Sequence, residues 1–140
     1  MPDGFSHTHA FRVRYSETDQ LGTFYNSRAL EWFEVGRTEL LRALELPYAE
    51  MERRKVFLPL VEAHVNFRGR ARYDDLLTMT SRLSLAGRAS LRFEVAITHA
   101  EPRAAPVASG YTIHAVTDGA GKPTRAPAWL TDLLAKEGTL

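Results

Sequence analysis

The stretch SRALEWFEVGRTELLRALE, residues 27–45, decides the fold. At about 3.6 residues per turn, its apolar side chains fall on one stripe that covers about half of the helix circumference. The members of this stripe are Ala29, Leu30, Trp32, Phe33, Gly36, Leu40, Leu41 and Leu44. Asn26 or Ser27 can cap the start of the helix, and Pro47 ends it soon after the stripe. So wide an apolar stripe predicts a helix that is buried among other elements.

Five further segments alternate apolar and polar side chains, which is typical of strands with one buried face. They span residues 9–15, 61–68, 77–85, 91–98 and about 107–117. In the first segment we expect Phe11, Val13 and Tyr15 on the buried face. Turn residues at 86–88 and 101–103 join the later strands as hairpins.

The elements follow the order strand, long helix and four antiparallel strands, with a short helix over residues 127–136 at the end. A sheet with one apolar face must bury that face, and only residues 27–45 form an element long enough to cover it. The sequence therefore predicts an α+β fold in which an antiparallel sheet of about five strands curls around one central helix. The length of 140 residues fits a single domain over residues 1–140.

Composition excludes several functional classes. The chain contains no cysteine, so disulfides, a thiol nucleophile and cysteine-ligated metals are excluded. Its 18 basic and 17 acidic residues are spread along the chain, which argues against nucleic acid as a partner. No apolar run approaches the roughly 20 residues that span a bilayer, and the N-terminus lacks the pattern of a signal peptide. We therefore expect a cytoplasmic protein with no membrane partner.

The turn ETDQLGTFYN, residues 17–26, places two acidic side chains and a glycine directly before the long helix. The first main-chain N–H groups of a helix carry partial positive charge and can bind a developing oxyanion. A carboxylate nearby, such as that of Asp19, can attack an acyl carbonyl or take a proton from water. Residue types alone leave a second reading open, because Asp before a helix is also a common cap or turn former.

Residues 15–42, YSETDQLGTFYNSRALEWFEVGRTELLR, resemble the signature of the hot-dog-fold acyl-CoA thioesterases of the 4-hydroxybenzoyl-CoA thioesterase type. The similarity includes Thr18, Asp19, Gly22, Tyr25 and the helix that carries Phe33, Arg37, Glu39 and Leu41. The strand order and the ending TDGAGKPTRAP, residues 117–127, extend the similarity over the whole chain.

This resemblance implies a hot-dog fold and hydrolysis of an acyl-CoA without a metal or another cofactor. Asp19 would act as nucleophile or general base, and the main-chain N–H of Asn26 would polarise the thioester carbonyl. Relatives often carry His or Tyr where this chain has Asn26, which leaves the amide in place but removes any role of that side chain. Gly22 and Tyr25 are expected to contact the substrate.

The phosphates of CoA need arginine or lysine near the mouth of the site. Arg68, Arg70 and Arg72 recur at every second residue and would share one strand face. Arg88 and Ser90 lie in the turn between the third and fourth strands, which in the resembled family often lies near the nucleotide. We expect Arg88 and Ser90 to bind substrate, although solvated strand ends are the alternative for all of these residues.

Two other charged side chains, those of Glu17 and Arg37, each allow a structural and a functional interpretation. Glu17 is either a charged neighbour that acts on Asp19 or an ordinary surface residue. Arg37 lies near the middle of the apolar stripe, and a buried guanidinium needs a partner. This position predicts an ion pair or carbonyl contacts between helix and sheet, or a contact near the site.

The remaining ionisable side chains have structural interpretations. The helix glutamates Glu31, Glu34 and Glu39 fall outside the apolar stripe or at its edge, so we expect solvated or interface charges. The histidines are His7, His9, His64, His99 and His114. None has a carboxylate at a helical ligand spacing, so we expect structural roles and no metal site.

A lone helix wrapped by one open sheet leaves two uncovered sheet edges. A homodimer that joins two sheets edge to edge would cover one edge of each copy, and the resemblance implies dimers that pair into homotetramers. Three functions remain open: an acyl-CoA thioesterase, a thioesterase for acyl carrier protein, and a non-catalytic protein that binds acyl-CoA. A dehydratase is disfavoured because no Asp and His pair is placed for that reaction.

Overall fold

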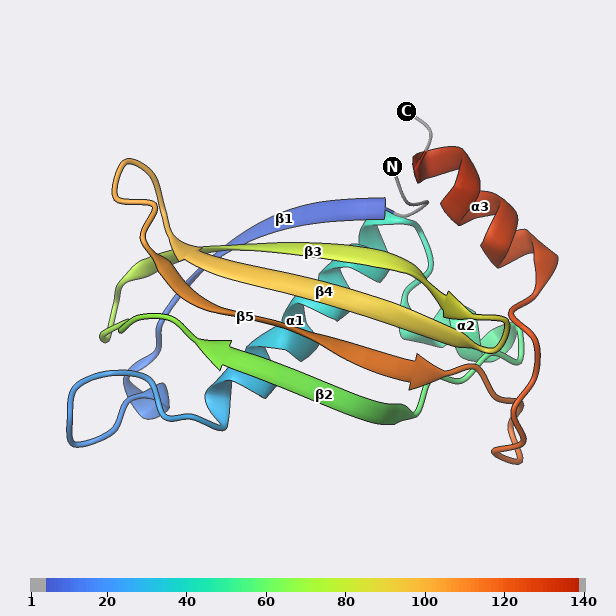
Figure 1. Ribbon diagram of the computed structural model, residues 1–140, viewed down its shortest axis with the longest axis horizontal. Helices are drawn as coiled ribbons and strands as arrows, with labels where there is room; N and C mark the ends of the chain where they lie inside the picture. Colours follow the sequence, from blue (N-terminus) through green and yellow to red (C-terminus); the bar gives the residue numbers. More distant parts are fainter. Residues whose placement is uncertain (1–4, 139–140) are drawn as a thin grey trace.

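The computed structural model describes residues 5–138, in which a five-stranded antiparallel sheet curls around one long helix (Figure 1). The strands are β1 (Phe5–Arg12), β2 (Leu60–Phe67), β3 (Leu76–Gly87), β4 (Ser90–His99) and β5 (Pro106–Ala115). Their order in the sheet is β1-β3-β4-β5-β2. The helices are α1 (Arg28–Ala43), α2 (Tyr48–Arg53) and α3 (Ala128–Gly138), and a 3-10 turn, η1, covers Tyr15–Glu17. The predicted α+β hot-dog architecture is confirmed.

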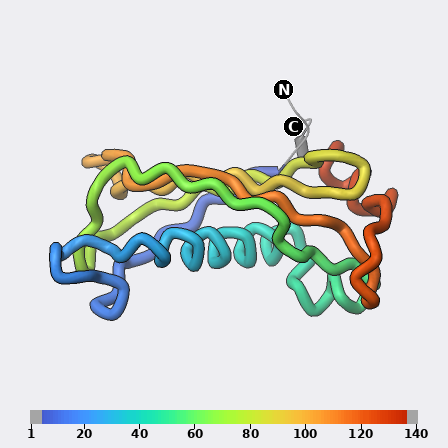
Figure 2. The backbone as a smooth tube through the Cα atoms, turned by 60° about the horizontal axis from the view of Figure 1, so that its bottom comes forward, coloured from blue at the N-terminus to red at the C-terminus, as the bar shows by residue number. Residues whose placement is uncertain are grey.

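Helix α1 runs along one face of the sheet, as Figure 2 shows. Its buried side chains are Ala29, Trp32, Phe33, Gly36, Leu40 and Leu41. Leu30 departs from the predicted stripe and is 42% exposed. It lies on the side of the helix that faces the uncovered strand β2, where it lines a groove together with Leu60. Within residues 5–138, each helix is too short or too polar to cross a bilayer.

Gly36 lets α1 approach the sheet closely. A Cβ atom built at Gly36 would lie 2.6 Å from Ser81 Oγ and 2.9 Å from Met79 Sδ on β3. Both distances are shorter than van der Waals contact, so a larger residue would require the side chains of Ser81 and Met79, or the helix, to move. The absence of a side chain here lets the middle of α1 lie close to the sheet.

The first strand differs from its predicted range of 9–15. Strand β1 begins at Phe5 and ends at Arg12, and the buried Val13 then donates its main-chain N–H to Asp75 O (3.0 Å). Tyr15 was expected on the buried face, but it begins η1 and is 78% exposed. The strand ends early because Arg14 N–H donates to Glu17 Oε1 (2.7 Å), which turns the chain into η1.

Helix α2 was not predicted, because its sequence YAEMER reads as a polar segment. Its one buried side chain is Met51, which packs in the apolar cluster at the end of the sheet near α3. A single buried residue in six is too little periodicity for a prediction from the sequence.

Strands β1 and β2 form the two edges of the sheet. Strand β2 is unusually exposed, with Leu60, Val61 and Phe67 at 53%, 61% and 52% exposure. A long edge strand with exposed apolar side chains is a surface that proteins normally cover.

His114 gives the fold a predictable pH dependence. It is 2% exposed, donates Nδ1–H to Leu58 O (2.9 Å) and accepts at Nε2 from the Thr112 hydroxyl (3.0 Å). A carbonyl oxygen can only accept, so Nδ1 carries the hydrogen, and a neutral ring leaves Nε2 free to accept from the Thr112 hydroxyl. Burial lowers the pKa of His114, and the charge of Arg37 lowers it further, while the bond to Leu58 opposes both.

We therefore expect the free energy of unfolding to fall as pH drops below about 6.5, the ordinary pKa of an unfolded histidine. In that range the unfolded chain takes up a proton that the folded chain refuses, and the loss continues until the folded pKa is reached. Urea unfolding at a series of pH values measures this slope, and His114→Gln should reduce it. His64→Gln, at an exposed histidine of β2, is the control and should leave the slope unchanged. An unaltered slope in His114→Gln would contradict the assignment.

Candidate active site

Asp19 lies in a tight hairpin loop that precedes α1. Thr18 and Phe24 form an isolated antiparallel bridge, and Asp19 N–H donates to Thr23 O (2.9 Å). Gly22 closes the turn by donating to Asp19 O (3.0 Å) at a φ of 82°, a left-handed conformation that favours glycine. Gly22 is therefore needed for the shape of this loop.

The Asp19 carboxylate does not cap the helix. Its Oδ1 accepts from Leu21 N–H (2.8 Å), two residues along, which is the pattern of an Asx turn. Its Oδ2 has no hydrogen-bond partner among residues 5–138, and the side chain is half-buried. The turn-forming reading of Asp19 is thus correct, the capping reading is wrong, and one carboxylate oxygen is left for chemistry.

Just before α1, a main-chain amide has no partner within residues 5–138. Ser27 occupies the N-cap position, but its side chain makes no capping hydrogen bond. Arg28 N–H donates to Tyr25 O (2.9 Å) and Ala29 N–H to Asn26 O (3.3 Å). Among residues 5–138, no acceptor takes the main-chain N–H of Asn26, which is exposed. An amide in this position can donate to an anion or a polarised carbonyl.

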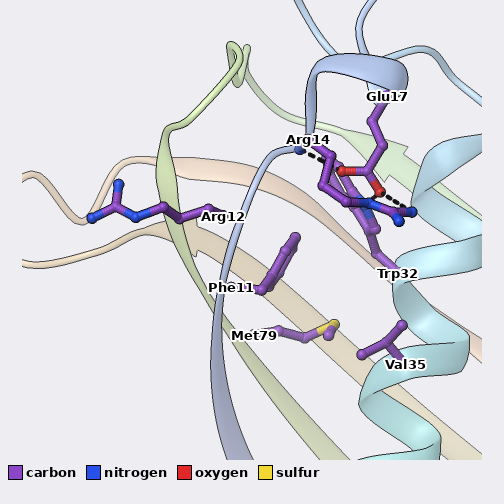
Figure 3. A pocket seen from close by; sticks show the side chains of 7 residues that line it. All are labelled: Phe11, Arg12, Arg14, Glu17, Trp32, Val35 and Met79. Carbon is purple, nitrogen blue, oxygen red and sulfur yellow. Dashed lines mark hydrogen bonds and ion pairs between the residues drawn. The ribbon is translucent and has the colours of Figure 1, made fainter.

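Glu17, which the sequence left as a charged neighbour or a surface residue, is 3% exposed. Its Oε1 accepts from Arg14 N–H (2.7 Å), and its Oε2 accepts from Trp32 Nε1–H (2.8 Å) and from the Arg14 guanidinium (3.2 Å; Figure 3). Burial raises the pKa of Glu17, but the hydrogen bonds from the Arg14 main chain, Trp32 and the Arg14 side chain outweigh it and leave the pKa below its ordinary value. The surface reading of Glu17 is therefore wrong.

A signal for the burial of Glu17 was present in the sequence. Trp32 lies on the buried stripe of the helix, and a buried indole N–H usually finds an acceptor. The turn before the helix offers carboxylates within reach, but the spacing of residues 17 and 32 does not reveal which of them the indole meets.

The arginines after β2 are arranged differently from the prediction. The strand ends at Phe67, and both Arg68 and Gly69 donate their main-chain N–H groups to Val107 O (2.8 and 3.0 Å). The shared acceptor ends regular pairing, so Arg68, Arg70 and Arg72 do not share a strand face. The segment then lies against the Asp19 loop, since Phe24 N–H donates to Ala71 O (2.9 Å). Arg72 thereby comes within 3.9 Å of the Cβ position of Gly22.

The β3–β4 turn, which carries Arg88 and leads into Ser90, lies at the opposite end of the sheet from the loop between η1 and α1, which carries Asp19 (Figure 1). Arg88 O accepts from Ala126 N–H (2.8 Å), and Ser90 pairs with Gly87 across the hairpin. A cavity of about 350 Å³ beside Arg88 is also lined by Arg125. Tyr25 lies at the Asp19 end, where its main-chain N–H donates to Glu17 O (2.8 Å) and its side chain is 54% exposed.

Within residues 5–138, Arg37 forms neither the expected ion pair nor a carbonyl contact. Its Nε donates to the Tyr48 hydroxyl (3.2 Å), and its guanidinium lies 5.9 Å from the centre of the Phe93 ring. It is only half-buried, because it lines the groove of about 180 Å³ between α1 and strands β2 and β5. An aromatic face and a neutral hydroxyl suffice for a guanidinium that keeps contact with solvent.

The expected surface glutamates of α1 are at its outer side. Glu31 pairs with Arg28 (2.9 Å), Glu39 pairs with Arg42, and Glu34 is exposed. His99, like His114, is buried, and its Nε2 lies 2.8 Å from Arg70 O. These contacts are structural.

The sequence matches the family model of the thioesterase-like superfamily over residues 13–134. The acyl-CoA thioesterase YbgC of Haemophilus influenzae is 32% identical over 95 residues, which cover 67% of this chain and 68% of that protein. The putative acyl-CoA thioesterase YneP of Bacillus subtilis is 40% identical over 63 residues, 45% of this chain. That alignment spans 46% of YneP, less than half of its length.

Solved structures agree with the fold. A hypothetical protein from Thermus thermophilus superposes with a TM-score of 0.83 at 30% identity, covering 92% of this chain and 97% of that one. A 4-hydroxybenzoyl-CoA thioesterase solved with 4-hydroxybenzoyl-CoA has a TM-score of 0.82 at 19% identity, covering 92% and 98%, a likeness that shows the fold alone. With a family match over most of its length and the hot-dog architecture in place, this chain belongs to the thioesterase-like superfamily.

Proposed function

We propose that this protein is a thioester hydrolase that converts an acyl-CoA and water into a carboxylic acid and free CoA. The observation that carries the proposal is that Asp19 does not cap α1. Within residues 5–138, one carboxylate oxygen of Asp19 and the Asn26 amide are both left without partners near the start of the same helix. The relatives named as acyl-CoA thioesterases support the same chemistry.

In the proposed reaction the Asn26 N–H donates to the thioester oxygen and stabilises the negative charge that develops there. Asp19 acts in one of two ways. As a nucleophile, its carboxylate bonds to the carbonyl carbon, CoA thiolate leaves, and water hydrolyses the resulting anhydride. As a general base, it takes a proton from the water that attacks the same carbon. Both routes require the free Asp19 oxygen.

The protein acts as a homodimer in this proposal, with two copies of β2 paired antiparallel about a two-fold axis. The pairing covers the exposed apolar side chains of Leu60, Val61 and Phe67. It also encloses the groove between α1 and β2, which is lined by Leu30 and Leu60, at the seam between the subunits. Two such dimers form the homotetramer that the family resemblance implies.

Antiparallel pairing at β2 reverses the second copy, so the β3–β4 turn of one subunit lies toward the Asp19 end of the other. Arg88, with Ser90 and the neighbouring Arg125, then binds the CoA phosphates of a substrate whose thioester lies beside the other subunit's Asp19. This arrangement gives a role to two groups of residues that one chain keeps apart.

Charge reversal in Arg88→Glu should raise KM for acyl-CoA with little change in kcat, because phosphate binding is lost and the reacting groups are untouched. Steady-state kinetics measure both constants. Mixing Arg88→Glu with Asp19→Asn and allowing subunits to exchange should restore activity at low substrate concentration, because each heterodimer then holds one intact site. If Arg88 serves the Asp19 of its own chain, mixing restores nothing and the dimer geometry is wrong.

The function is tested by thiol release from short, long and aromatic acyl-CoAs and from acyl carrier protein. Release from CoA esters supports the proposal, and the profile across the acyl groups identifies the substrate. Faster release from acyl carrier protein would move the assignment to that carrier. Tight binding of acyl-CoA without release would make the protein a non-catalytic binder and overturn it.

A further inference from the structure

We propose that Glu17 is a positioning residue that fixes the Asp19 carboxylate relative to the Asn26 main-chain N–H. The inference rests on the proposed function, in which these two groups act on one thioester. Glu17 itself touches no substrate in this account, because its carboxylate is buried and fully engaged by protein donors.

The side chain of Glu17 joins the loop to the helix. Through Oε2 it accepts from Trp32 Nε1–H (2.8 Å), one turn into α1, and through Oε1 from Arg14 N–H (2.7 Å), at the end of β1. Bonds from polar groups to a charged, water-excluded carboxylate are short and strong. One carboxylate therefore connects the strand, the 3-10 turn and the helix.

The main chain of Glu17 adds a second connection. Its carbonyl oxygen accepts from Tyr25 N–H (2.8 Å), the residue immediately before Asn26. Asp19 follows Glu17 by two residues and is held in its own hairpin by the bond to Thr23 O (2.9 Å). Glu17 is thus bonded on one side to the segment that carries the free amide and continues on the other into the loop that carries the free carboxylate.

The anchor on the helix is rigid. Trp32 is 3% exposed, and its ring packs against Phe11 and Phe24, with ring centres 5.1 and 4.8 Å apart. Beside it lies a cavity of about 270 Å³ whose lining includes Glu17, Val35 and Met79 (Figure 3). Because the rings of Phe11 and Phe24 restrict the Trp32 side chain, its hydrogen bond also restricts the position of the Glu17 carboxylate.

Glu17→Gln keeps the shape of the side chain, but its amide group cannot accept hydrogen bonds from all of the donors that surround the carboxylate. Both carboxylate oxygens face N–H donors, whereas an amide has one oxygen and one NH₂ group, so one buried donor faces another. The loop then loosens from α1, and the two reacting groups lose their spacing. Misplacement of about 1 Å can cost on the order of a hundredfold in rate, so we expect kcat to fall about tenfold to a hundredfold with KM changed little.

Trp32→Phe is the second variant, because it removes the indole N–H together with one ring of the indole and keeps an aromatic ring in the core. It should also lower kcat. The double variant should be no worse than Glu17→Gln alone, since both substitutions disturb the same hydrogen bond between residues 17 and 32. Trp129→Phe is the matched control, the same substitution at the other tryptophan. Trp129 belongs to α3, and the Arg54 guanidinium lies over its ring. This control should leave kcat unchanged.

Two measurements that do not depend on activity accompany the kinetics. Hydrogen exchange at the Tyr25 amide should quicken in Glu17→Gln. That amide donates to the main-chain carbonyl of residue 17, and this bond weakens when the loop loosens from α1. In the Trp129→Phe background the fluorescence reports Trp32 alone, and its emission should shift in Glu17→Gln.

The outcomes separate this inference from the function. If the parent hydrolyses acyl-CoA and Asp19→Asn does not, but folded Glu17→Gln keeps the parental kcat, Glu17 is not a positioning residue and the function stands. If Glu17→Gln fails to fold, an unchanged kcat in Trp32→Phe overturns the inference in the same way. A parent that hydrolyses no acyl-CoA overturns both.

Discussion

Asp19→Asn should lower kcat for acyl-CoA hydrolysis by about a thousandfold or more, because it replaces the carboxylate oxygen that is proposed to attack the carbonyl or to accept a proton from water. The fold should be unaffected. The amide oxygen of asparagine can accept from Leu21 N–H as the carboxylate does (2.8 Å), so the turn keeps its hydrogen bond. Thiol release under saturating substrate measures kcat, and urea unfolding measures stability.

Asn26→Ala is the matched comparison for this variant, at the other half of the site. The side chain of Asn26 is exposed, and the group assigned to it is the main-chain amide, which alanine retains. We therefore expect kcat within a few-fold of the parent. Equal activity of Asp19→Asn and the parent would remove Asp19 from the mechanism, and loss of activity in Asn26→Ala would show that the side chain takes part.

The central helix was predictable from its wide apolar stripe, and strands β3 and β4 from their regular alternation, whereas β5 alternates less cleanly. Residues 27–45 enclose α1 (Arg28–Ala43), and residues 77–85 lie within β3 (Leu76–Gly87). The prediction was weakest where tertiary contacts overrode the local pattern. Tyr15 continues the alternation of β1, yet the buried Glu17 draws the chain away from the sheet.

The residues of the candidate site could be predicted from the sequence, but the side-chain contacts of Glu17 and Arg37 could not. The Asp19 loop, Gly22 and the start of α1 are contiguous in sequence, so local turn chemistry places them together. The partners of Glu17 and Arg37 are not local, since Trp32 and Tyr48 lie 15 and 11 residues away. Whether a charged residue faces solvent, a ring or an indole depends on packing that periodicity does not encode. In the same way, the sequence did not reveal that Arg88 and Asp19 lie at opposite ends of the sheet within one chain.

Gly110→Ala should destabilise the fold by about 3 kcal/mol or more, because β5 and β2 leave no room for a side chain at this position. Gly110 lies opposite Val65 in β2, and its Cβ would fall 1.9 Å from His64 O and 3.1 Å from Phe33 Cε2. The first obstacle is a main-chain atom, which cannot rotate away. The strand itself must move, and β2 is an edge strand held in the sheet only by β5.

Gly119→Ala provides the control, because its nearest neighbour is Phe57 Cε2 at 3.6 Å, an ordinary van der Waals distance. It should change the free energy of unfolding by about 0.5 kcal/mol or less. A comparable loss of stability in both variants would point to a general intolerance of alanine rather than to the clash at β2.

Since β2 is also the proposed dimer edge, displacement of the strand by Gly110→Ala should weaken self-association along with folding. Light scattering after size exclusion tests this link: a Gly110→Ala protein that unfolds more easily but dimerises like the parent would place the dimer contact away from β2.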